Sequence, residues 1–134
     1  MTNLEELQRF VDDSPFGPWW GFVVESAGKG AASVRLPHRP QFERPGGILH
    51  GGCAAILADV AVWVALIAEV EGGERAVTVH LATDYLAAAR GDIIGTARLL
   101  KVGRRLAVAS VETRTAEDTL VSVHQVTYAL ASRT

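Results

Sequence analysis

The stretch Pro45-Gly46-Gly47-Ile48-Leu49-His50-Gly51-Gly52 runs directly into an apolar segment from Cys53 to Ala68. Within this segment Asp59 is the only charged residue, and apolar residues recur on every face at helical spacing. Such a pattern is typical of a helix that is buried on all sides, so we expect a sheet to wrap it. An ionised carboxylate in these surroundings costs several kcal/mol unless it is paired or faces a wet cleft. Asp59 is therefore either a paired core charge or a functional residue.

The composition predicts one globular domain over residues 1–134. The chain of 134 residues is 49% hydrophobic and has a formal net charge of -2, which gives no reason to expect nucleic acid or an anionic membrane as a partner. The first residues lack the basic and apolar regions of a signal peptide. The segment from Cys53 to Ala68 is too short to span a membrane and is interrupted by Asp59. The single Cys53 cannot form an internal disulfide, which fits the cytoplasm.

Turn residues divide the rest of the chain into one short helix and six strands. Runs rich in Val, Ile, Thr and Leu between Gly- and Pro-containing breaks are typical of strands. This order of elements predicts an α+β fold in which an antiparallel, mostly meander sheet curls round the apolar helix and leaves edges that a second chain could pair. The predicted elements are a helix at 4–11, strands at 19–25 and 32–36, a loop at 37–47, the central helix at 53–68, and strands at 76–85, 92–100, 105–114 and 119–130.

The start of the central helix, at His50-Gly51-Gly52, predicts an anion-binding position. Backbone N–H groups in the first turn have no partner inside the helix, and the helix dipole is positive there, so Gly51 or Gly52 could hold an oxyanion or a phosphate. The alternative is that both glycines only permit a tight turn into the helix. Asp59 favours a functional interpretation, because it is a poor mid-helix residue; its own alternative is a core pair with a strand arginine.

The spacing of Gly51 and Asp59 predicts a site that two chains share. The two residues are eight positions apart, which is about 12 Å along a helix. An oxyanion donor and a base must both lie within about 3 Å of one reacting group. One helix cannot supply both, so we expect a two-fold symmetric homodimer with shared active sites, alone or as half of a homotetramer.

Other chemical motifs are weak. Cys53 could act as a nucleophile in the first helical turn, but a small core residue is the more common role. The four histidines lie on separate predicted elements without ligand spacing, so we expect neither a metal nor a cofactor. They are His38, His50, His80 and His124.

Residues 46–59, from Gly46 to Asp59, closely resemble the signature of hotdog-fold acyl-CoA thioesterases of the phenylacetate-degradation (PaaI-like) type. The His-Gly-Gly-x6-Asp spacing matches without a gap, and the similarity in layout extends over nearly the whole chain. The resemblance implies a hotdog fold, with an antiparallel sheet wrapped around one long central helix. It also implies that Gly51 donates the oxyanion-hole N–H, that Asp59 of the opposing subunit activates water or attacks the thioester, and that Thr78 assists.

Arg44 departs from the pattern of this family. Many members have Asn or Gln six residues before the histidine, where this chain has an arginine, which cannot accept a hydrogen bond. Arg44 could instead steady Asp59 or a phosphate of the substrate. The resemblance further implies that coenzyme A lies along the subunit surface, where its phosphates could meet Arg90 and the turn that contains Gly103, Arg104 and Arg105.

We therefore predict a cytoplasmic acyl-CoA thioesterase in which Gly51 stabilises the oxyanion, His50 orients the loop and Asp59 acts on water or as the nucleophile. Trp63 shares the helix face of Asp59, so it either fills the core or floors a short acyl pocket, which would favour medium-chain or aromatic acyl groups. Two alternatives remain. One is a non-catalytic acyl-CoA-binding protein, which Arg44 favours, and the other is a hydratase or dehydratase in which His50 and Asp59 form an acid–base pair.

Overall fold

The structure of the chain, a computed structural model, describes residues 3–131. Within these residues a long central helix is accompanied by two further α-helices and two 3-10 helices, and eight strands form a large and a small sheet. In chain order the elements are α1 (Leu4–Asp13), α2 (Gly17–Trp20), β1 (Val23–Gly28), β2 (Ala31–Leu36), η1 (Pro40–Phe42), β3 (Glu43–Arg44), β4 (Ile48–Leu49), α3 (Gly51–Glu69), η2 (Gly73–Arg75), β5 (Val77–Tyr85), β6 (Ile93–Val102), β7 (Leu106–Thr115) and β8 (Leu120–Ala129).

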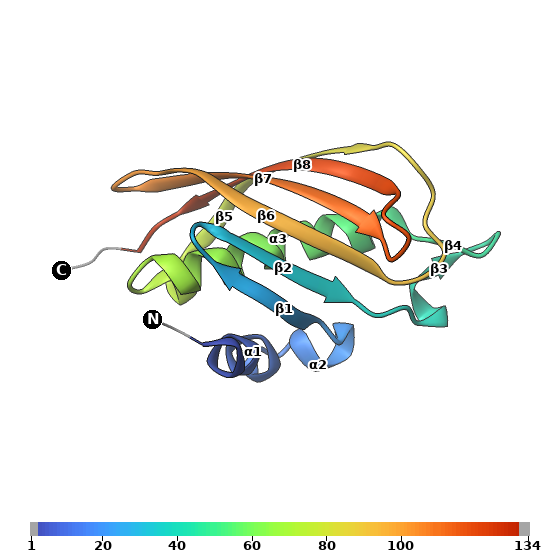
Figure 1. Ribbon diagram of the computed structural model, residues 1–134, viewed down its shortest axis with the longest axis horizontal. Coiled ribbons are helices and arrows are strands. Elements are labelled where there is room, and N and C mark those ends of the chain that lie inside the picture. Colours follow the sequence, from blue (N-terminus) through green and yellow to red (C-terminus); the bar gives the residue numbers. More distant parts are fainter. Residues whose placement is uncertain (1–2, 132–134) are drawn as a thin grey trace.

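The large sheet is antiparallel throughout and has the strand order β1-β2-β6-β7-β8-β5. It curves over α3, while α1 and α2 lie beside β1 (Figure 1). The predicted hotdog architecture is therefore confirmed. The meander is confirmed only for β6, β7 and β8, because β2 pairs with β6, and β5 pairs with β8 at the sheet edge. Edge strand β5 thus lies next to the last strand of the chain and not next to β6.

The core lies between the sheet and α3. Alternate residues of the strands point inward, as the buried Ala32, Val34 and Leu36 of β2 do. The prediction that α3 is buried on every side is wrong along one stripe. Residues at helical spacing on this stripe are partly exposed, because the other elements of the chain cover them only in part. They are Gly51, Gly52, Ala55, Ile56, Asp59 and Trp63.

The predicted strand at 19–25 is wrong at its start. Trp19 and Trp20 belong to the short helix α2, and the strand begins at Val23. Aromatic residues favour strands, but Pro18 in the first helical turn and Gly21 after the last turn delimit a helix here. Gly21 has φ +78°, a left-handed conformation that glycine adopts without strain. The predicted loop at 37–47 also contains η1 and strand β3.

The length argument against a membrane span is also wrong. Helix α3 has 19 residues and a mean hydropathy of 2.1, so by length and composition it could cross a membrane. In the structure, however, most of this helix is packed under the sheet, as expected for the core helix of a globular domain. Its apolar composition is therefore explained by the core.

Candidate active site

His50 lies directly before α3 and organises the first turn of this helix. The His50 side chain accepts a hydrogen bond at Nδ1 from the Gly52 N–H, at 2.8 Å, and so acts as the N-cap. Within residues 3–131, the N–H of Gly51 has no hydrogen-bond acceptor. Of the two glycines expected to bind an anion, Gly52 is thus occupied by His50, and Gly51 presents the free donor at the positive end of the helix.

The hairpin before α3 fixes the position of His50. Strand β3 pairs with β4 through a turn at Gly46 and Gly47, whose φ values of +103° and +77° favour glycine. The carbonyl of Gly46 accepts a hydrogen bond of 2.9 Å from Arg90, and the N–H of Leu49 donates to the carbonyl of Ala89 at 2.8 Å. Arg90, expected to meet coenzyme A phosphates, therefore anchors this hairpin to the segment after β5.

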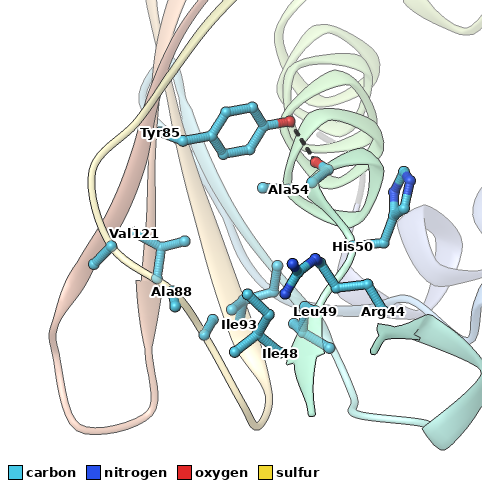
Figure 2. Close-up of a pocket in the computed structure, with 12 residues that line it drawn as sticks. Arg44, Ile48, Leu49, His50, Ala54, Tyr85, Ala88, Ile93 and Val121 are labelled. Atoms are coloured by element: carbon cyan, nitrogen blue, oxygen red, sulfur yellow. Dashed lines mark hydrogen bonds between the residues drawn. The ribbon is translucent and has the colours of Figure 1, made fainter. Parts of the chain in front are cut away.

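A cavity of about 380 Å³ opens beside Gly51 and Tyr85 (Figure 2). Its wall is mostly apolar and comes from the β3–β4 hairpin, the start of α3, the segment after β5, and strands β6 and β8. Arg44 and His50 supply polar groups, and the Arg44 guanidinium is directed toward the cavity. The apolar lining residues are Ile48, Leu49, Ala54, Ala87, Ala88, Ala89, Ile93 and Val121.

Asp59 is held by two hydroxyl groups. Its Oδ1 atom accepts hydrogen bonds from Thr78 Oγ1 at 2.7 Å and from the Tyr128 hydroxyl at 2.9 Å. Across residues 3–131, Asp59 takes part in no ion pair, so the alternative of a core pair with an arginine is wrong. Burial, and after it the negative charge of Asp59, raises the pKa of Tyr128, so this hydroxyl stays protonated and donates.

Gly51 and Asp59 lie on the same helix, as predicted, and are about 12 Å apart along its axis. Both residues lie on the partly exposed stripe of α3. His50 is engaged at the helix start and does not contact Asp59. Within one chain, therefore, neither a Gly51–Asp59 site nor a His50–Asp59 pair is assembled.

Two further predicted groups lie away from the cavity. The indole N–H of Trp63 donates to the carbonyl of Glu74 at 3.1 Å, and its ring packs 6.2 Å from that of Phe16. Ile93, at the first end of β6, lines the cavity. The turn that contains Gly103, Arg104 and Arg105 follows the other end of this strand. Ten residues of strand span roughly 33 Å, so this turn does not reach the cavity of its own chain.

The remaining sequence candidates give no additional centre. Cys53 is buried, and burial raises the pKa of its thiol, which disfavours the thiolate that a nucleophile needs. Among residues 3–131, no three His, Cys, Asp or Glu side chains could hold a metal ion together. Tyr85 and Tyr128 were not among the residues predicted from the sequence. For the buried Tyr128 the available signal was its place in a strand, where a hydroxyl that points inward needs a partner. Tyr85 is 53% exposed and gave no such signal.

Comparisons with known proteins show relatives that are similar over most of the chain. A family model described as "Thioesterase superfamily" matches residues 46–122. A putative esterase of Halobacterium salinarum is 34% identical over 118 residues, which cover 84% of this chain and 78% of that protein. A medium/long-chain acyl-CoA thioesterase of Escherichia coli is 28% identical, and the match covers 90% of this chain and 88% of that protein. A 1,4-dihydroxy-2-naphthoyl-CoA hydrolase of Listeria monocytogenes is 24% identical, with coverages of 84% and 93%.

Solved structures share the fold. Zebra fish thioesterase superfamily member 2 has a TM-score of 0.84 at 28% identity and covers 98% of this chain and 100% of that chain. The conserved protein PA5202 of Pseudomonas aeruginosa has a TM-score of 0.80 at 32% identity, with coverages of 88% and 94%. The similarity thus extends over almost the whole sequence and includes the start of α3.

Proposed function

This chain belongs to the thioesterase superfamily, and on that basis we propose that it hydrolyses an acyl-CoA to the free acid and coenzyme A. The observation that carries the proposal is the pair of groups on the exposed stripe of α3. One is the free N–H of Gly51 at the positive helix end, beside an apolar cavity. The other is the carboxylate of Asp59, whose Oδ2 atom has no hydrogen-bond donor among residues 3–131.

These groups suit hydrolysis of a thioester. The Gly51 N–H and the helix dipole stabilise the negative charge that develops on the carbonyl oxygen. Asp59 takes a proton from water as the water oxygen attacks the carbonyl carbon, or attacks that carbon itself to form a mixed anhydride, which water hydrolyses to the free acid after the thiolate has left. The C–S bond then breaks and the thiolate departs, with little need for an acid because a thiol has a pKa near 8.5. His50 keeps the donor in place, and Thr78 orients the carboxylate.

A homodimer would complete each site, with Gly51 from one chain and Asp59 from the other. Edge strand β5 supports this proposal, because no other strand within residues 3–131 pairs with its outer edge, and it carries exposed apolar side chains, among them Val77 at 62% and Val79 at 56%. The exposed stripe of α3 lies beside this edge, since Thr78 of β5 contacts Asp59. Two such dimers could form a homotetramer.

We propose a medium-chain or aromatic acyl group. A volume of about 380 Å³ is at the small end of ligand pockets, and an apolar wall suits a hydrocarbon group. The two relatives named for acyl-CoA substrates act on medium/long-chain and dihydroxynaphthoyl groups. Trp63 could limit the pocket only from the partner chain, because in its own chain it packs away from the cavity.

Coenzyme A would lie across the subunit surface in this proposal. Arg44 stands at the rim of the cavity, where it could meet a phosphate or the pantetheine. The turn with Gly103, Arg104 and Arg105 could contribute only from another chain, because it is remote from the cavity of its own. Arg90 would act mainly by holding the hairpin. We propose the cytoplasm as location, because the single Cys53 is free and buried.

A thiol-release assay tests the proposal. A panel of acyl-CoA thioesters is incubated with the protein and a thiol-reactive dye, and Asp59→Asn serves as the matched variant. We expect free thiol from the wild type and a loss of nearly all kcat, with KM retained, in Asp59→Asn. Tight binding of acyl-CoA without thiol release would favour the non-catalytic binding protein that Arg44 suggests. A changed product with its thioester intact would favour a hydratase.

A further inference from the structure

Asp59 receives an unexpected contact from the last strand. The Tyr128 hydroxyl on β8 is 2.9 Å from Oδ1 of Asp59 and also 2.9 Å from the backbone carbonyl oxygen of the same residue. One hydroxyl therefore links the carboxylate to its own backbone. Tyr128 is only 4% exposed and approaches from the core, whereas Thr78 approaches the same Oδ1 from the sheet edge.

The sheet register explains why two hydroxyls meet at one oxygen. Thr78 of β5 and Tyr128 of β8 are direct cross-strand partners, so their side chains leave the same face of the sheet. A β-bulge follows in β5, where the register shifts between Thr78 and His80. Bulges occur next to active sites because the extra residue bends a strand and redirects a side chain. Here the bulge adjoins the strand position whose side chain contacts Asp59.

Donors on one oxygen restrict what the carboxylate can do. Rotation about the Asp59 side chain would break both the Thr78 and the Tyr128 hydrogen bond, so Oδ1 is confined to the side of the sheet. The Oδ2 atom, which has no donor among residues 3–131, is left as the open acceptor on the partly exposed stripe of α3. A reacting group can lose about 10²-fold in rate when it is misplaced by ~1 Å.

We propose that Tyr128 is a positioning residue, which with Thr78 holds Oδ1 of Asp59 so that Oδ2 faces the water or thioester. The inference rests on the proposed function, because it assigns the reaction to Asp59. It differs from a purely structural role, in which Tyr128 would only tie β8 to the carbonyl of α3. The two roles share the same contacts, so their separation needs kinetics.

The experiment compares three hydroxyl deletions on folded protein. Tyr128→Phe removes one donor from Asp59, Thr78→Val removes the other, and Thr113→Val removes a fully buried hydroxyl that bonds Ser122 and does not touch Asp59. Tyr128→Phe keeps its aromatic ring and leaves Oδ1 bonded to Thr78, so we expect it to fold. We expect kcat to fall about tenfold or more in Tyr128→Phe and Thr78→Val, with KM within about twofold of the wild type. Thr113→Val should lower the melting temperature and leave kcat unchanged.

Two further variants define the outcome. Thr78→Ser keeps a hydroxyl where Thr78→Val has none, and it should retain most of the wild-type kcat. In an Asp59→Asn background, Tyr128→Phe should cause no further loss of kcat, because both changes act through one carboxylate. A Tyr128→Phe protein with wild-type kcat and a lowered melting temperature would overturn the inference and leave the proposed function intact. Wild-type kcat in Asp59→Asn would instead overturn the catalytic assignment of Asp59, and the positioning role of Tyr128 with it.

Discussion

The hydroxyl of Tyr85, at the end of β5, donates a hydrogen bond to the carbonyl oxygen of Gly51 in the first turn of α3. Tyr85 therefore lies directly against the residue that presents the free N–H. A Cβ atom added to Gly51 would be 3.0 Å from the Tyr85 hydroxyl oxygen, closer than real Cβ atoms normally approach. The space that Tyr85 takes therefore favours glycine at position 51.

From this contact we predict that Gly51→Ala loses activity through Tyr85. The new methyl group must displace the tyrosine hydroxyl and so change the wall of the cavity beside the N–H donor. We expect kcat/KM for a short acyl-CoA to fall about tenfold or more, because a shift of about 1 Å in a group next to the reacting atoms can cost about 10²-fold in rate. Adding Tyr85→Phe to Gly51→Ala removes the clashing oxygen and should recover part of the loss. No recovery in the folded double variant would mean that the methyl group acts elsewhere.

Subunit mixing tests the shared site. Gly51 is the first residue of α3, where proline is tolerated, and His50 before it is extended, so Gly51→Pro should keep the helix while it removes the N–H. Gly51→Pro and Asp59→Asn homodimers should each be inactive. Refolding an equal mixture should restore up to about a quarter of wild-type activity, because half of the dimers are mixed and each mixed dimer has one intact site. A mixture as inactive as its parents, with heterodimers verified by mass, would contradict the shared site.

How much the sequence could predict depended on the distance over which residues interact. The Gly51–Asp59 spacing follows from local helical geometry, and both residues lie on α3 as predicted. Turn signals gave the four strands after α3 to within two residues at each end. The helix at Trp19 and Trp20 was missed because aromatic propensity favours a strand, whereas Pro18 and Gly21 set the local conformation.

The contacts of Asp59 depend on pairing between distant strands. Tyr128 lies 69 residues from Asp59 in sequence, and it reaches the carboxylate only because β8, and not β6, is the neighbour of β5. No periodicity in a single segment reveals that neighbour. The partly exposed stripe on α3 was missed for a similar reason, since an all-apolar helix does not reveal which face the rest of the chain leaves uncovered.

The burial of His124 predicts that the folded protein loses stability in acid. It is 5% exposed, its ring nitrogens contact Thr83 Oγ1 and Ser122 Oγ at 2.8 Å each, and burial lowers its pKa to about 4. Because the folded state favours the neutral ring, this stabilisation is complete above pH 6.5, the usual pKa in the unfolded chain, and is lost as pH falls toward 4. The group should contribute a drop of about 3 kcal/mol in the free energy of unfolding over that range.

Denaturant titrations at several pH values measure this effect. The variant His124→Gln keeps hydrogen-bonding groups but cannot gain the charge, so its unfolding free energy should depend less steeply on pH between 6.5 and 4. Its stability at pH 7 should be lower than that of the wild type, because the ring packs in the core. Equal slopes for the two proteins in that range would show that other groups dominate acid unfolding.

A pair of substitutions can show whether the cavity beside Gly51 or the side chain of Trp63 determines which acyl chain length the protein prefers. Ala88 lines the cavity and is exposed at its rim, so Ala88→Leu should fill space without straining the core. Trp63→Ala opens space near α1 and removes packing against Phe16, at a cost of roughly 3 to 5 kcal/mol in stability if the cavity stays empty. Each methylene that an enlarged pocket buries contributes about 0.8 kcal/mol, or about fourfold in kcat/KM.

The measurement is kcat/KM over a series of acyl chain lengths for the folded variants. If the cavity beside Gly51 holds the acyl group, Ala88→Leu should shift the optimum to shorter chains, and Trp63→Ala should leave the rank order unchanged. If Trp63 of the partner chain floors the pocket, Trp63→Ala should extend the accepted chain length and Ala88→Leu should have little effect. The first result is expected, because the Trp63 indole is tied to Glu74 and Phe16 on the α1 side of the helix, whereas the cavity adjoins the Gly51 N–H.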